Sequence, residues 1–158
     1  MRIRQYTYFG IGSEVMSAAE MSDRLGMPPD EYSVRGSTST HDPVVPRSHA
    51  WKVVCQEPGR RVDDQIRSVI GRLEPVVDRI AELVVELRQL ESGRTTTLQV
   101  VRFFDHGEGE EDRPNPSAEE LGMIKLDGQH FLLGWHLDKY VLEFLERTGA
   151  ELDVDEYG

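Results

Sequence analysis

The chain has little cysteine and a deficit of positive charge. Cys55 is the only cysteine in 158 residues, so no disulfide can form within the chain, and we expect a protein of the reducing cytoplasm. The 18 Lys and Arg residues stand against 29 Asp and Glu residues, which gives a formal net charge of −11. Nucleic-acid binding needs positive charge that neutralises phosphates, so this balance argues against DNA or RNA as partners.

Long apolar runs and known catalytic motifs are also missing. No apolar run approaches the length of a bilayer span, so we expect no membrane segment. The sequence contains no Walker loop, HExxH, paired CxxC or GxSxG pattern. Gly10 and Gly12 follow a predicted strand but lack the third glycine of a dinucleotide loop. We therefore expect no cofactor.

The negative charge is concentrated in two windows. Residues 105–120 contain seven acids and one base, and residues 143–156 contain six acids and one base. Pro114 and Pro116 indicate that the first window is a loop, which we predict to be an acidic insertion in a single domain spanning 1–158. Acidic surfaces associate quickly with basic proteins, as bacterial immunity proteins do with cationic toxins. The other interpretation of this acidic window is a solvated loop that binds no partner.

Hydrophobic periodicity predicts alternating strands and helices. The expected strands cover 2–11, 49–56, 95–104 and 150–157, with a short edge strand near 32–34 and a hairpin that pairs 123–126 with 130–137. Ser17 and Glu20 have the spacing of a capping box for a short helix that Gly26 ends. Asp138 is the expected N-cap of a helix that extends through Arg147.

The strongest pattern is an apolar stripe between Val62 and Leu90, with three- and four-residue steps that predict helix. Pro75 lies inside the stripe, and the sequence leaves open whether it kinks one helix or separates two. The order of elements predicts an α+β fold. We expect a two-layer sandwich with a mainly antiparallel sheet and helices on one face, ferredoxin-like in outline.

One predicted sheet face combines cationic and aromatic side chains. Its expected members are Arg2, Arg4, Tyr6 and Tyr8 from the first strand, either Trp51 or Lys52 from the second, and His136. Arginine and aromatic residues anchor many protein interfaces. If the helices cover only the other face, these residues can bind a protein partner or a second copy of the chain. A cover formed by the 30–48 loop or by a second subunit is the alternative.

A metal centre is the competing hypothesis. Asp105, His106, His130 and His136 could form one if neighbouring strands bring them together, which would suit a small metal-dependent hydrolase. The alternative interpretation is that these histidines lie exposed on a strand, because their spacing does not identify a metal site. We therefore favour a non-enzymatic binding module, assign no catalytic residues and expect no bound metal.

Short motifs spread along the chain resemble those of a known family. They are Tyr8–Gly12, Arg24–Pro28, Val34–Gly36, Trp51–Val53, Leu73–Pro75, Gly134–Leu137 and Thr148–Tyr157. In this order they resemble the bacterial domain of unknown function family DUF4279. The resemblance covers nearly the whole chain, with residues 107–121 as an insertion. It implies a compact α+β fold and no assigned activity.

Overall fold

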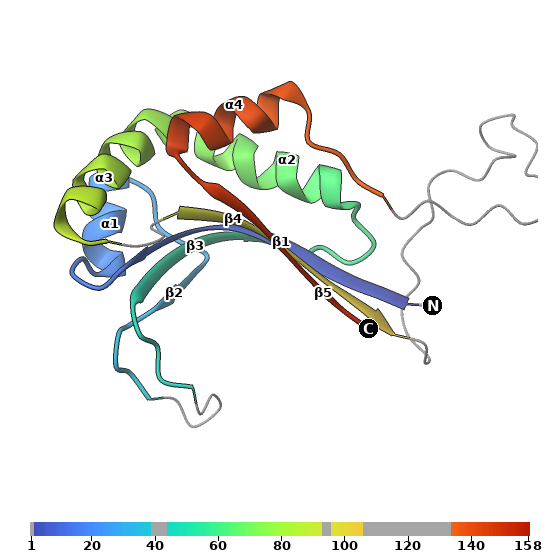
Figure 1. Ribbon diagram of the computed structural model, residues 1–158, viewed down its shortest axis with the longest axis horizontal. Coiled ribbons are helices and arrows are strands. Elements are labelled where there is room, and N and C mark those ends of the chain that lie inside the picture. Colours follow the sequence, from blue (N-terminus) through green and yellow to red (C-terminus); the bar gives the residue numbers. More distant parts are fainter. Residues whose placement is uncertain (1, 39–43, 93–95, 106–133) are drawn as a thin grey trace, which may run out of the picture.

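Alternate side chains of the first strand point to opposite sides of the sheet. The sheet and the helices form two layers (Figure 1). The computed structural model describes residues 2–38, 44–92, 96–105 and 134–158. Along β1 (Arg2–Ser13), Phe9 and Ile11 are buried under the helices, whereas Tyr6 and Tyr8 lie on the other side.

The sheet has five strands in the order β2-β3-β1-β4-β5. The other strands are β2 (Glu31–Ser33), β3 (His49–Cys55), β4 (Thr96–Asp105) and β5 (Glu151–Tyr157). β1 is antiparallel to β3 and β4, β2 is antiparallel to β3, and β5 is parallel to β4. The first four strands have the order of a ferredoxin-like sheet, and β5 extends it. This confirms the predicted α+β sandwich with a mainly antiparallel sheet.

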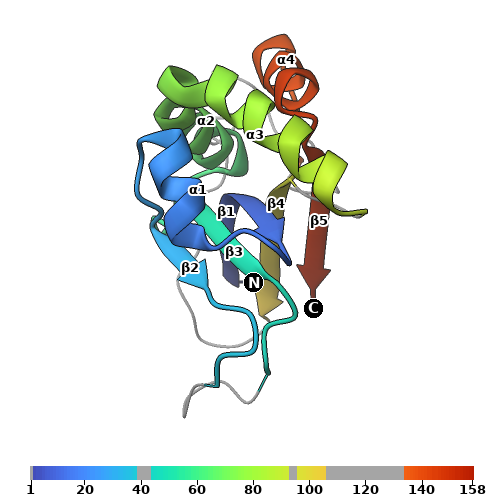
Figure 2. The ribbon, with the colours of Figure 1, turned by 90° about the vertical axis from the view of Figure 1, so that its left-hand side faces the viewer.

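The helices cover one face of the sheet, and in Figures 1 and 2 they lie above its convex side. They are α1 (Ala18–Leu25), α2 (Val62–Leu73), α3 (Val77–Leu90) and α4 (Lys139–Thr148). α2 packs on β1 and β3, and α3 packs against α1 and α4. α4 also connects β4 to its parallel neighbour β5, a link that cannot be made by a tight turn. None of the described helices is long and apolar enough to cross a bilayer.

The core lies between these layers. Its largest fully buried side chains are Phe9, Ile11, Met21, Leu25, Trp51, Ile66, Ile70, Leu73, Ile80, Leu83, Leu87 and Leu98. Complete burial of one such aliphatic side chain stabilises the fold by about 1.5–3 kcal/mol. The apolar stripe of the sequence therefore supplies most of the helical side of the core, and α1 and α4 supply the rest.

Pro75 separates two helices. A 3-10 turn at Glu74–Val76 follows α2 and leads into α3. Proline lacks the N–H that a continuous α-helix would need there, and its ring would contact the preceding turn. The structure thus resolves the alternative that the sequence left open, and the two helices run over different parts of the sheet (Figure 1).

The predicted caps are confirmed. Ser17 and Glu20 form a reciprocal capping box at α1, with Ser17 N donating to Glu20 Oε2 at 2.8 Å. Asp138 caps α4 by accepting the Val141 N–H at 3.0 Å. Gly26 and Gly149 end their helices in the left-handed region, at φ values of 65° and 61°.

Two predictions about strands need correction. The first strand does not end at Ile11 but continues to Ser13, and Gly10 and Gly12 both pair with β3. Residues 123–133 of the predicted hairpin lie outside the described part of the chain, as does the acidic loop beyond Asp105. Residues 134–137 form no strand, because the His136 N–H donates to Asp63 Oδ1 at 3.0 Å as the chain enters the cap of α4.

A pair of glycine variants tests the helix ends. Gly149→Ala should lower the free energy of unfolding by about 1–2 kcal/mol, because alanine is strained in the left-handed region. An added Cβ would also lie 2.8 Å from Arg88 Nη2. Gly71→Ala, within α2 and with nothing within 4 Å of the added Cβ, should instead raise it by about 0.5–1 kcal/mol. Urea unfolding measures both, and equal effects would contradict this assignment.

Candidate functional site

The sheet face opposite the helices carries aromatic side chains between two charged margins. We call this surface the open face. Its principal residues are Glu31 on β2, Lys52 and Val54 on β3, Arg4, Tyr6 and Tyr8 on β1, Gln99, Val101 and Phe103 on β4, and Asp153, Asp155 and Tyr157 on β5. The strand register aligns them in rows, such as Arg4, Phe103 and Tyr157.

The rings of the open face form two stacked pairs. The Tyr6 and Tyr8 centroids are 6.3 Å apart with an interplanar angle of 17°, and those of Phe103 and Tyr157 are 5.0 Å apart at 15°. The Lys52 Nζ lies 4.4 Å from the Tyr8 centroid. At exposed sites such cation–π contacts contribute about 0.5–1 kcal/mol each. The face is therefore organised before any partner binds.

Gly10 makes room for this arrangement. A Cβ at Gly10 would lie 3.3 Å from Tyr8 Cε2 and 3.7 Å from Lys52 Cγ. The ring and the lysine stem occupy the space beside the glycine, so its lack of a side chain serves the aromatic packing. The glycine-rich sequence after Phe9 thus belongs to the open face and not to a nucleotide loop.

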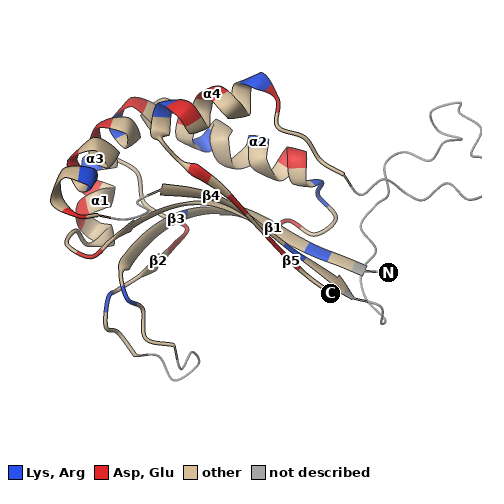
Figure 3. Ribbon diagram, in the orientation of Figure 1, with Lys and Arg blue, Asp and Glu red and all other residues tan. Residues whose placement is uncertain are grey.

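Burial and nearby carboxylates make the tyrosines resist ionisation. Burial is the main cause that raises the pKa of Tyr8, and Tyr6, Asp155, Asp153 and Glu31 raise it further. The pKa of Tyr6 is raised by burial first, and then by Tyr157, Glu31 and Asp155. Both hydroxyls therefore stay protonated at neutral pH, beside negative charge from β2 and β5. Figure 3 shows the acidic segments of β5.

Asp155 is the best-defined carboxylate of this face. Gln99 Nε2 donates to Asp155 Oδ2 at 3.0 Å, which holds the carboxylate over the β4–β5 pair. Only one of its oxygens is used by this bond, so the other can accept from a ligand cation. The arrangement suits the binding of cationic groups next to aromatic rings.

The structure confirms some of the expected positions and corrects others. Arg4, Tyr6 and Tyr8 share the open face, and Arg2 pairs through its backbone with Asp105. Trp51 is fully buried in the core, because it is paired with Ile11, and Lys52 takes the open-face position. His136 lies in the helical layer, with Nδ1 3.4 Å from Asp63 Oδ2 on α2.

Sequence reasoning missed Phe103, Tyr157 and Asp155. The alternation within each strand could have placed them on one face of β4 or β5. Their proximity to Tyr6 and Tyr8 depends on the strand order, which the sequence does not state. Between β2 and β3, the described residues 34–38 and 44–48 extend beyond the strand ends and not across the middle of the sheet (Figures 1 and 2).

The structure does not describe the four proposed metal ligands together. The side chains of Asp105, His106 and His130 lie outside the described part of the chain, and His136 contacts Asp63. Elsewhere in the described ranges, no group of three or more His, Cys, Asp or Glu side chains could hold a metal ion. The metal centre stays a sequence prediction.

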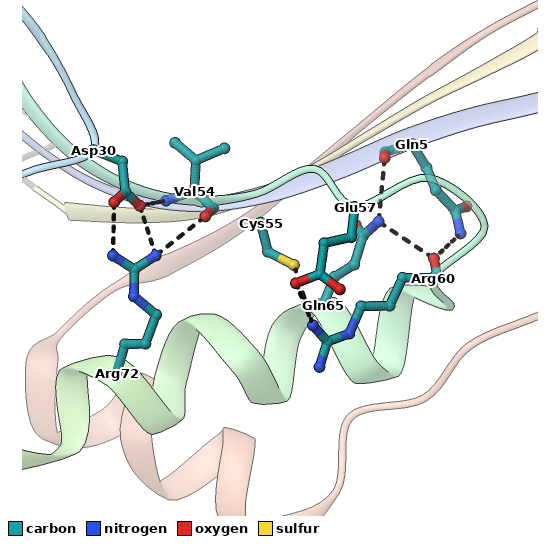
Figure 4. A network of polar contacts seen from close by, with 8 residues as sticks. All are labelled: Gln5, Asp30, Val54, Cys55, Glu57, Arg60, Gln65 and Arg72. Carbon is teal, nitrogen blue, oxygen red and sulfur yellow. Dashed lines mark hydrogen bonds and ion pairs between the residues drawn. The ribbon is translucent and has the colours of Figure 1, made fainter.

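A separate polar network joins the sheet to α2 (Figure 4). The Arg72 guanidinium binds both oxygens of Asp30, at 2.6 and 2.7 Å. Asp30 Oδ2 also accepts the Val54 N–H at 2.7 Å, and Arg72 donates to the Val54 carbonyl. Asp30 and Arg72 thus hydrogen-bond to backbone groups of β3 beyond the point where the short strand β2 pairs with it. They close this part of the sheet edge to another strand.

The other end of the network is buried. Gln65 accepts from Thr7 Oγ1 at 3.2 Å and donates to the carbonyls of Gln5 and Arg60. Cys55 lies nearby, buried, with its Sγ 3.9 Å from Arg60 Nη1. Every one of these contacts lies between β1, β3 and the start of α2. We interpret the network as structural.

Asp30→Asn tests this edge closure. The hydrogen bonds from Arg72 are the main cause that holds the pKa of Asp30 below its usual range, against the opposing effect of burial. A lowered folded-state pKa gives stability that is present above the unfolded pKa of about 3.9 and is lost as pH falls through the folded value. The free energy of unfolding of the variant should therefore be about 1 kcal/mol lower than that of the parent protein at pH 7. This difference should shrink below pH 3.

Urea unfolding at both pH values measures this difference. Asp23→Asn, at an exposed position on α1, is the matched control and should change little. A deficit that is the same at both pH values would contradict the role of the Asp30 charge.

The chain was compared with known proteins in three ways. Searches of curated proteins and of solved structures found no match. A family model described as a domain of unknown function, DUF4279, matches residues 3–158. That match spans the helical layer, the sheet and the open face alike. The chain therefore belongs to the DUF4279 family, a domain of unknown function.

Proposed function

We propose that this protein is a non-enzymatic binding module whose open face docks a basic protein. The observation that carries the proposal is the row of aromatic rings flanked by carboxylates on a sheet surface that the helices do not cover. Tyrosine and other aromatic residues contribute much of the binding energy at protein interfaces. The stacked pairs are held in place in the free protein, so little side-chain freedom is lost on binding.

Charge selects the kind of partner. Asp153 and Asp155 lie on one side of the tyrosines and Glu31 lies on the other, and all three raise the pKa of Tyr8. Lys52 and Arg4 already lie over rings of the same face. With a formal net charge of −11, the protein attracts basic partners at long range and repels acidic ones.

The setting that we propose is the bacterial cytosol. There the basic partner is a cationic toxin, which this protein neutralises as an immunity protein does, or a protein whose activity it regulates. A second copy of the chain is the competing occupant of the open face. The experiment below separates the two occupants.

The double variant Tyr6→Ala/Tyr8→Ala should weaken partner binding at least tenfold, because it removes the central rings of the face. A photo-crosslinking amino acid at position 8 should first capture the partner in cells and identify it by mass spectrometry. Titration of that purified partner then measures its dissociation constant with each variant, and raising the salt concentration should weaken binding further.

Tyr140→Ala is the matched control. Tyr140 lies on α4, where its hydroxyl donates to Glu74, so this variant should bind like the parent protein. Circular dichroism and urea unfolding must show that the double variant is folded. Crosslinks only to a second copy of the chain, or equal binding by the double variant, would overturn the proposal.

A further inference from the structure

Between β2 and β3, the described residues 34–38 and 44–48 form a basic surface with exposed apolar side chains. We call these residues the arm. The arm extends on the side of the sheet that faces away from the helices (Figures 1 and 2). It includes Arg35 and Arg47 and no acid, in a chain whose formal net charge is −11. The arm is therefore a positive feature of an acidic protein.

Hydrogen bonds hold the arm in place. The Gly36 N–H donates to the Pro46 carbonyl at 2.9 Å, and the Arg35 N–H donates to His49 Nδ1 at 3.2 Å. Arg35 Nη1 also donates to the Glu14 carbonyl at 3.0 Å, which connects the arm to the chain just after β1. These bonds fix the arm as an extension of the sheet.

Apolar side chains are exposed along this extension. Tyr32, in β2 at the base of the arm, is 68% exposed, and Val34 and Val45 are about half exposed. Arg47, two residues after Val45, is exposed as well. Exposed apolar groups together with arginine are typical of a surface that contacts another protein.

We propose that the arm of a second copy of the chain occupies the open face until the basic partner displaces it. This inference rests on the proposed function and adds regulation to the same site. The open face complements the arm in charge, because its two central tyrosines lie between the carboxylates of Glu31 and Asp155. The arginines of the arm would bind these carboxylates and rings, and its valines would cover apolar surface.

A two-fold axis allows both contacts to form at once. The arm and the open face lie on the same side of the sheet, so two copies that face each other can each place an arm under the other's sheet (Figure 1). An axis parallel to the strands brings β2 of one copy opposite β5 of the other, because the rotation reverses the strand order. Arg47 of one copy would then approach Asp155 of the other, and this contact occurs twice in the dimer.

The net charge limits the strength of such a dimer. Two copies with a formal net charge of −11 repel each other at long range, whereas a basic partner is attracted. The partner therefore associates with the open face faster than a second copy does. The dimer covers the aromatic rings in the absence of the partner and dissociates when the partner binds.

Complementary charge reversals test this contact in the full-length protein. Sedimentation velocity should show a monomer–dimer equilibrium for the parent protein. Arg47→Glu and Asp155→Arg should each weaken the dimer about tenfold, because each change acts at two contacts. A mixture of the two variants should restore dimerisation. In the mixed dimer the reversed arm meets the reversed face, and the unchanged arm meets the unchanged face.

Lys139→Glu is the matched control for Arg47→Glu. It makes the same change in net charge on α4, where the Lys139 side chain is exposed, and should leave the dimer nearly unchanged. Circular dichroism must show that all three variants are folded. A parent protein that is monomeric at about 1 mM, or a mixture that dimerises no better than its single variants, would overturn the inference. An equal loss in the control would show an effect of net charge alone and would overturn it as well.

The crosslinker at position 8 separates this inference from the proposed function. Crosslinks to the arm of a second copy, replaced by crosslinks to the partner when it is added, would support both. Partner binding that the Tyr6→Ala/Tyr8→Ala variant loses, together with a monomeric parent protein, would overturn the inference and leave the proposed function in place. Crosslinks to the arm alone, in cells as in the purified protein, would support the contact between copies and overturn the proposed function.

Discussion

The structure depends on the two-residue repeat of an extended strand at the centre of the sheet. In β1 this repeat sends Phe9 and Ile11 into the core and Tyr6 and Tyr8 to the open face. A shift of the pairing by one residue would exchange the two sets and would bury hydroxyls while exposing core side chains. Stability and the candidate binding surface therefore depend on the same register.

The helical layer explains why that register is so well defined. α2 and α3 supply a continuous apolar surface, and α2 packs directly on β1 and β3. The break at Pro75 allows two helices of moderate length to follow a curved sheet where one straight helix would diverge from it. All of the helices lie on one side, which leaves the other side to polar and aromatic chemistry.

Local signals in the sequence predicted much of the fold. The capping box at Ser17, the helix end at Gly26 and the Asp138 cap of α4 were correctly interpreted because these signals act within a few residues. The first strand was predicted to end too early, since a glycine that ends a strand and one that makes space for a neighbouring ring, as Gly10 does for Tyr8, look alike in a sequence. His136 was placed on the wrong surface, and the choice between Trp51 and Lys52 was left open, for a different reason. Their positions depend on which strands are neighbours, and on whether residues 134–137 form a strand at all.

The position of β1 in the sheet also bears on how the protein folds. Its two neighbours, β3 and β4, come much later in the chain, and β2 is not adjacent to it. The central pairing cannot begin from a local hairpin, so distant segments must meet before the hydrophobic layer closes. Such topologies fold more slowly than those built from contacts between neighbours. Until β4 pairs with β1, one edge of β1 has unpaired backbone groups. Such an exposed edge promotes aggregation, so we expect chaperones to assist the newly synthesised chain at this stage.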